Sequence, residues 1–257
     1  MVVLAVSGKV CAAGTQDTRT YGFELHTDAQ ELMMNRVERA RNRIEARIYQ
    51  DAIGEPPGDK WKMIVPFFME HGFAARVLRK RLGLSTPLNT TDRIVLEQVI
   101  FPHYSQDAAI RKMLFVGCGT YTAHYQRLFF PQKDFWTIEP DPGAARHGAP
   151  QHIMAPLEEL ERHFPENEFD LIICNGVFGW GLDRHDQCEA AFSQCHSRLA
   201  RDGQFLFGWD DVARRTPVAL ETLSSLTRFR PYTFPPLRTS RYVTETPYRH
   251  TYAFYRK

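Results

Sequence analysis

The chain has 257 residues and 43% hydrophobic content, enough to bury the core of one larger domain, alone or with a helical extension. Its 32 basic and 30 acidic side chains leave a formal net charge of +2. This near balance provides no overall attraction to nucleic acid or to a membrane surface, and it favours a small or neutral partner. No apolar run approaches the roughly 20 residues that a membrane span requires. The sequence therefore predicts neither a nucleic-acid partner nor a membrane partner.

Cysteine usage and the start of the chain both favour a cytoplasmic protein. The five cysteines are odd in number, sparse and without a C-x-x-C pair. Neither a disulfide framework nor a metal site is therefore predicted, and reduced thiols are expected. The apolar start, Met1 to Val6, is short and has no basic region before it, so we do not interpret it as a signal peptide.

The first part of the chain is predicted to be mainly helical. Apolar residues recur among charged ones at helical spacing over 28–50. A second helical stretch, in two pieces, covers 61–82 and carries a basic cluster from Arg76 to Arg81, which we interpret as a solvated helix face. A further helix over 91–101 is expected to stop before Pro102.

From residue 112 the chain changes to short apolar runs that alternate with helical stretches. The strand candidates are 113–116, 135–138, 151–153, 170–174 and 203–207. Helical stretches separate most of them, at 122–130, 157–164 and 185–199. The segments 241–243 and 251–255 are interpreted as two closing strands.

Strands that alternate with helices indicate a parallel sheet wound on both faces. We therefore predict an α/β fold with a doubly wound, mostly parallel seven-stranded sheet over residues 108–257. A mainly helical N-terminal extension over residues 1–107 precedes it and is expected to cap the pocket.

A glycine turn follows the first predicted strand. Gly117-Cys118-Gly119-Thr120 stands between that strand and a predicted helix. Glycines allow a sharp turn and a close approach of the backbone to a ligand. The exposed amides at a helix start favour a polar or anionic group. Alone, the pattern also fits an ordinary tight turn between strand and helix.

An acidic residue ends the second predicted strand. Glu139 lies 20 residues after Gly119, and a carboxylate there can accept hydrogen bonds from both ribose hydroxyls of a nucleoside. The glycine turn and the acid together are more specific than either alone. Thr122 occupies the third glycine position of the dinucleotide fingerprint, which disfavours NAD.

These residues resemble the class I methyltransferases, which have a Rossmann-like fold and use S-adenosylmethionine. The turn Gly117 to Thr120 is similar to their GCGT motif, and Glu139 matches their ribose-binding acid. Segment 169–175 resembles their fourth strand, and 199–204 resembles the turn into their fifth. The resemblance covers roughly residues 108–210 and implies S-adenosylmethionine as the cofactor and methyl transfer as the reaction.

The resemblance also implies which residues form the site. The expected cofactor-binding residues are Gly117, Cys118, Gly119, Thr120, Glu139, Pro140, Pro156, Leu157, Asn175, Gly176 and Val177. The expected acceptor-pocket residues are Tyr121, Phe178, Trp180 and Trp209.

The chain departs from the family pattern at two positions. Phe115 stands where the family usually has an acid, and Tyr121 stands where it usually has a further glycine. The acid commonly helps to hold the methionine end of the cofactor. Asn175 and the backbone near Gly117 are the candidates to replace it.

The catalytic residues are harder to predict. His185, Asp210 and His103 are candidates for a general base or an orienting group. A solvated histidine is the safer interpretation of the two histidines, and a salt bridge or helix cap explains Asp210 equally well. A sulfonium methyl group is already activated, so alignment of the acceptor and exclusion of water are the main requirements. A small-molecule acceptor is expected, but its identity, the methylated atom and the oligomeric state stay open.

Three other functions remain alternatives. One is an NAD-dependent oxidoreductase on a Rossmann fold, and another is a non-catalytic cofactor-binding or scaffolding protein. The third is a nucleic-acid methyltransferase that uses the cluster from Arg76 to Arg81. The near-neutral charge disfavours the third, and the sequence has Asn175-Gly176-Val177-Phe178 where many base-modifying relatives have an N-P-P-Y-like tetrapeptide.

Overall fold

Eight strands form a single sheet in the part of the chain that the structure describes, residues 88 and 90–257 of a computed structural model. The strand order is β3-β2-β1-β4-β5-β8-β6, and β7 also pairs with β8. The strands are β1 Lys112–Val116, β2 Asp134–Ile138, β3 Gln151–Ile153, β4 Phe169–Asn175, β5 Leu199–Asp210, β6 Arg230–Pro231, β7 Arg241–Val243 and β8 His250–Arg256. The first five are parallel, and β8 runs antiparallel to β5.

The mostly parallel sheet with helices confirms the predicted fold class. All seven predicted strands form, and the eighth, β6, has only two residues. A two-residue strand is too short to show an alternation of apolar and polar residues, so the sequence carried no signal for it.

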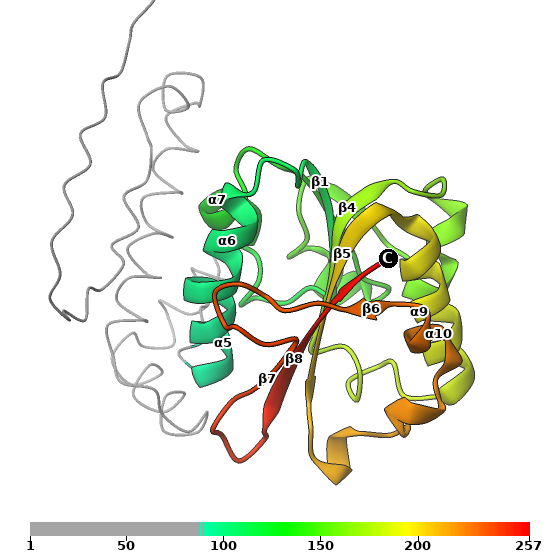
Figure 1. Ribbon diagram of the computed structural model, residues 1–257. Helices are drawn as coiled ribbons and strands as arrows, with labels where there is room; N and C mark the ends of the chain where they lie inside the picture. Colours follow the sequence, from blue (N-terminus) through cyan, green and yellow to red (C-terminus); the bar gives the residue numbers. More distant parts are fainter. Residues whose placement is uncertain (1–87, 89) are drawn as a thin grey trace, which may run out of the picture. The chain divides into compact units, whose positions relative to one another are not determined.

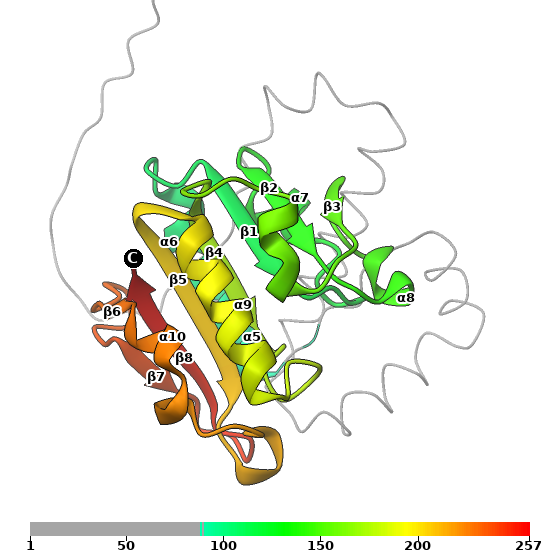
Figure 2. The same cartoon turned by 90° about the vertical axis from the view of Figure 1, so that its right-hand side faces the viewer.

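Helices cover both faces of the sheet (Figure 1). On one face lie α5 Thr91–Val95, the π-helical turn η1 Leu96–Ile100, α6 Phe101–Gln106 and α7 Tyr125–Phe129. On the other lie α9 His185–Arg198 and α10 Ser224–Thr227, and Figure 2 shows α9 crossing over β4 and β5. The remaining short helices are η2 Leu157–Arg162, η3 Ala213–Arg215, η4 Leu220–Thr222 and α8 Pro142–Ala145. None of the helices in the described part is long and apolar enough to cross a membrane.

Each face of the sheet has its own hydrophobic core. Phe192 of α9 packs with Phe205 and Phe207 of β5 in one cluster. Phe101 of α6 packs with Phe129 of α7 in the other, which also contains apolar residues of β1 and β4. The helical run 91–106 therefore shares a core with the sheet.

The helix before the sheet continues through Pro102, where the sequence predicted that it would stop. It runs on to Gln106 because the π-helical turn Leu96–Ile100 leads into α6, in which the proline is the second residue. Such a turn changes the hydrogen-bond register, which accommodates a residue that has no N–H to donate.

The helices predicted after the strands differ in length. The stretch 122–130 is helical only over α7, because Thr122 closes a turn by accepting from the Gly119 amide at 3.0 Å. The stretch 157–164 becomes the 3₁₀ helix η2, whereas 185–199 forms α9 as predicted. The helices expected over 28–50 and 61–82, with the basic cluster, lie outside the described residues. The boundary at residue 107 stays a prediction.

Candidate functional site

The candidate site lies at the carboxyl edge of the parallel strands. β1 pairs with β2 on one side and with β4 on the other, so the chain order reverses between β1 and β4. Ligands of open α/β sheets bind outside the carboxyl ends of the strands at such a switch point. The glycine turn follows β1 at this edge, Glu139 follows β2, and Asn175 ends β4.

Gly117 fits its position only as glycine. Its φ is +85°, which L side chains rarely adopt, and a Cβ atom there would lie 2.9 Å from Val177 Cγ2. Its amide donates to the Ile138 carbonyl over 2.9 Å. The turn after β1 is therefore tied to the end of β2 and rests against the turn after β4.

The Glu139 carboxylate is held by backbone amides. Cys118 N donates to Oε2 over 3.1 Å, and Asp141 N donates to Oε1 over 2.9 Å. Each carboxylate oxygen keeps a second lone pair, so the half-buried group can still accept from a ligand's hydroxyls. The Cys118 side chain takes no part in this bond, and burial raises the pKa of its thiol to about 12.

A buried polar chain joins three strands at the same edge. His250 Nδ1 lies 2.8 Å from Asp210 Oδ1, and His250 Nε2 lies 3.0 Å from Asn175 Oδ1. All three residues are buried. Gly208 makes room for them, because a Cβ there would lie 1.9 Å from Asn175 Oδ1. The chain thus fixes the Asn175 amide at the end of β4.

Sequence reasoning missed His250. It opens β8, which is antiparallel to its neighbour β5, so the first residue of β8 meets the last residue of β5, Asp210. A histidine near the C-terminus gives no sign of this pairing until the strand order is known.

Arg93 is the second residue that sequence reasoning missed. It is buried on α5, and its Nη1 donates to the Tyr125 hydroxyl over 2.8 Å, while that hydroxyl donates to Glu97 Oε1 over 2.7 Å. Its guanidinium stacks over the Tyr121 ring at 4.7 Å. A Cβ on Gly176 would lie 3.9 Å from Arg93 Nη2, so the positive charge reaches the turn after β4.

The four predicted acceptor-pocket aromatics fall into two groups. Phe178 and Trp209 are buried in the core on the α9 face, where both pack against Phe207. Trp180 is 54% exposed, and Arg215 lies over its ring at 3.4 Å. Tyr121 is half-buried beneath Arg93. Trp180 and Tyr121 are therefore the two of the four that present surface.

The other predicted cofactor residues surround this edge. Pro156 is half-buried directly before η2, whereas Leu157 points into the core. Thr120 and Pro140 are exposed at the turns after β1 and β2.

The three candidate catalytic residues lie on different elements. Asp210 bonds to His250 at the carboxyl edge. His185 is exposed at the start of α9, with Nε2 3.3 Å from the Thr222 carbonyl. His103 lies on α6, which leads to the start of β1, and packs edge-on against Phe234 with ring centroids 4.8 Å apart. The structure thus places Asp210 within the candidate site.

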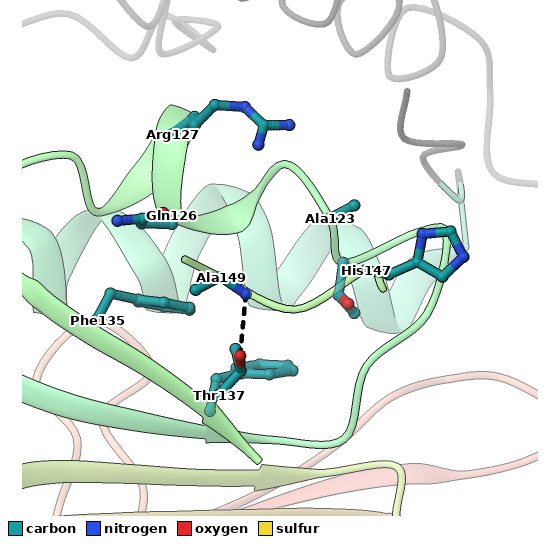
Figure 3. A pocket seen from close by; sticks show the side chains of 9 residues that line it. Ala123, Gln126, Arg127, Phe135, Thr137, His147 and Ala149 are labelled. Carbon is teal, nitrogen blue, oxygen red and sulfur yellow. Dashed lines mark hydrogen bonds between the residues drawn. The ribbon is translucent and has the colours of Figure 1, made fainter. Parts of the chain in front are cut away.

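A separate hollow lies between α7 and β2 (Figure 3). Phe135, Arg127 and His147 are among its lining residues. Thr137 Oγ1 accepts there from Ala149 N over 2.9 Å, which ties the segment before β3 to β2. Among the described residues, no group of three or more histidine, cysteine or acidic side chains could hold a metal ion.

Comparisons with known proteins agree with this geometry. Residues 114–207 match the sequence model of a family described as a methyltransferase domain. A comparison with curated protein sequences gives no match.

Two solved structures illustrate the structural similarity. The N-methyltransferase NodS from Bradyrhizobium japonicum WM9 is 18% identical, with 65% of this chain and 96% of that chain covered at a TM-score of 0.49. A TehB-like SAM-dependent methyltransferase from Corynebacterium glutamicum is 19% identical, with 62% and 86% covered at a TM-score of 0.45.

The matched range runs from β1 into β5 and includes the glycine turn, Glu139 and Asn175. S-adenosylmethionine is the methyl donor of this family, which confirms the cofactor prediction at the level of the family. Residues 114–207 therefore match the methyltransferase-domain family, and this match supports the predicted class I, S-adenosylmethionine-dependent family.

Proposed function

We propose that the protein transfers the methyl group of S-adenosylmethionine to a small-molecule acceptor by in-line displacement. The observation that carries the proposal is the bond from Cys118 N to Glu139 Oε2, which sets a carboxylate beside the glycine turn. A carboxylate in this place recognises the two hydroxyls of a ribose.

The residues present fit an adenosyl cofactor with an amino-acid end. Gly117 adds no side chain to the turn after β1, so that turn packs directly against Val177 at the carboxyl edge. Asn175 Nδ2 is buried and makes no hydrogen bond with the residues that the structure describes, so it offers a donor to a ligand. The turns that carry these residues follow β1 and β4.

When bound, S-adenosylmethionine supplies a sulfonium methyl group that needs no further activation. The protein's own residues bind and orient the reactants and exclude water. We assign ribose binding to Glu139 and the shaping of the acceptor side to Tyr121 and Trp180. Asp210 is bonded to His250, so we assign it a role in holding the site and not the removal of a proton.

The proposed acceptor is a small molecule with apolar or aromatic character. The near balance of charges, a net charge of +2, provides no overall attraction to nucleic acid. Trp180, exposed at the turn after β4, offers a flat apolar face, and Arg215 beside it offers a positive charge.

The test is methyl transfer from radiolabelled S-adenosylmethionine to three pools: small aromatic and aliphatic compounds, duplex and single-stranded nucleic acid, and denatured protein. Label in the small-molecule pool, reduced at least about tenfold by Trp180→Ala, is the expected result. Label only in nucleic acid or protein would refute the acceptor class and leave the methyltransferase assignment intact.

A further inference from the structure

Two hydrogen-bond donors lie beside Gly176, the residue that follows β4. One is Asn175 Nδ2, which is buried and lacks a hydrogen-bond partner among the described residues. The other is the Arg93 guanidinium, whose Nη2 would lie 3.9 Å from a Cβ on Gly176. The NH₂ group of Asn175 and the Arg93 guanidinium can only donate hydrogen bonds, and Arg93 carries a positive charge. Together they suit an anionic group that accepts hydrogen bonds.

The direction of the Asn175 amide is set by His250. His250 Nδ1 faces Asp210 Oδ1 at 2.8 Å, which fixes the orientation of the ring. The oxygen of the Asn175 amide, and not its nitrogen, faces His250 Nε2 at 3.0 Å. With its oxygen held by His250, the amide turns its NH₂ group away from β8.

The position of these donors matches one end of the cofactor. β2, β1 and β4 are neighbours, and adjacent strands lie about 4.8 Å apart, so Glu139 and Asn175 follow strands separated by roughly 10 Å. A ligand whose ribose lies at Glu139 and which extends across β1 reaches Asn175 with its other end. In S-adenosylmethionine that end is an amino acid, which carries a carboxylate.

We propose that His250, held by Asp210, is a positioning residue that fixes the Asn175 amide so that it donates, together with Arg93, to the carboxylate of S-adenosylmethionine. The inference rests on the proposed function and assigns residues to the cofactor's amino-acid end. Phe115 stands where the family usually has an acid that helps to hold the methionine end of the cofactor. In this chain Arg93 and Asn175 hold that end instead, by donating to the carboxylate of the cofactor.

The test compares two ligands that differ only in this group, S-adenosylmethionine and its decarboxylated form. Calorimetry gives the ratio of their affinities for the wild-type protein and for His250→Phe, which keeps a ring against Tyr252 but cannot donate. We expect wild type to prefer the carboxylated ligand and His250→Phe to lower that preference about 10-fold to 100-fold. The matched control is His196→Phe on α9, whose ring packs against Phe229 and which should leave the ratio unchanged.

Asn175→Asp provides a second variant if His250→Phe does not fold. It keeps an oxygen toward His250 and places an oxygen where the NH₂ group stood, so it should also lower the preference. If the folded variant keeps the wild-type ratio of affinities for the two ligands, the inference is overturned, even where both affinities are reduced. The proposed function would still stand. A wild-type protein that binds neither ligand would overturn both.

Discussion

The backbone amide of Cys118 donates to Glu139 Oε2 over 3.1 Å and joins the turns that follow β1 and β2. The bond uses the main chain of the glycine turn, so it depends on the path of the backbone and not on the cysteine side chain. A second amide, that of Asp141, holds the other oxygen. The Glu139 carboxylate, which we propose binds the ribose, is thus positioned by the backbone of the two turns.

Replacing Cys118 should therefore have little effect. Cys118→Ala keeps the amide, and we expect its affinity for S-adenosylhomocysteine, measured by calorimetry, to stay within about twofold of wild type. Because burial raises the pKa of the thiol to about 12, Cys118 should also resist alkylation by iodoacetamide at pH 8. A tenfold loss of affinity in the alanine variant would show that the thiol itself contributes.

Gly208→Ala should disturb the buried chain from Asp210 to Asn175. The added Cβ would lie 1.9 Å from Asn175 Oδ1 and would displace the amide. We expect S-adenosylhomocysteine to bind about tenfold more weakly, the effect of losing one hydrogen bond. In the control Gly143→Ala the nearest atom to the added Cβ is 3.3 Å away. Equal affinities for the two variants would contradict the role of Asn175.

Arg93 should matter for stability as well as for binding. It donates to the Tyr125 hydroxyl, which in turn donates to Glu97, and both Arg93 and Glu97 are buried. Arg93→Met removes the donor to the buried Tyr125 hydroxyl and the ion pair with Asp92, and should cost about 3 kcal/mol of unfolding free energy in urea denaturation. The control is Arg162→Met, which breaks an exposed ion pair with Glu159 and should cost under about 1 kcal/mol. A loss for Arg93→Met as small as that expected for the control would show that the network adds no stability.

His124 should make the protein less stable in acid. Burial, with smaller contributions from Arg127 and Arg93, lowers the pKa of this histidine to about 3 from its usual 6.5. Between about pH 6.5 and pH 3, His124 is therefore protonated in the unfolded chain but not in the folded state. Unfolding free energy should fall as the pH drops below 6.5, by up to about 1.4 kcal/mol per pH unit from this group, until about pH 3.

His124→Phe tests this assignment, because a phenyl ring can pack against Tyr125 and Phe129 as the imidazole does. Urea denaturation at pH 7, 6 and 5 should show a shallower decline for the variant than for wild type. Parallel declines would mean that other groups cause the acid sensitivity.

The sequence predicted those parts of the site that depend on local pattern. Short apolar runs marked the parallel strands, and the spacing from the glycine turn to Glu139 predicted that the two lie together at one edge of the sheet. Arg93 and His250 were not predictable, because α5 and β8 bring them to the edge from distant parts of the chain. Phe178 and Trp209 were expected to line a pocket, but an aromatic residue near a strand end gives the same sequence signal when it packs in the core.

The central claim is that Glu139 and the glycine turn bind an adenosyl cofactor, and calorimetry tests it most directly. We expect S-adenosylmethionine and S-adenosylhomocysteine to bind with micromolar dissociation constants and NAD not to bind. Glu139→Ala should weaken both adenosyl ligands at least about tenfold, and the exposed control Glu166→Ala should not. Binding of NAD alone, or equal affinities for the Glu139→Ala variant and wild type, would contradict the account.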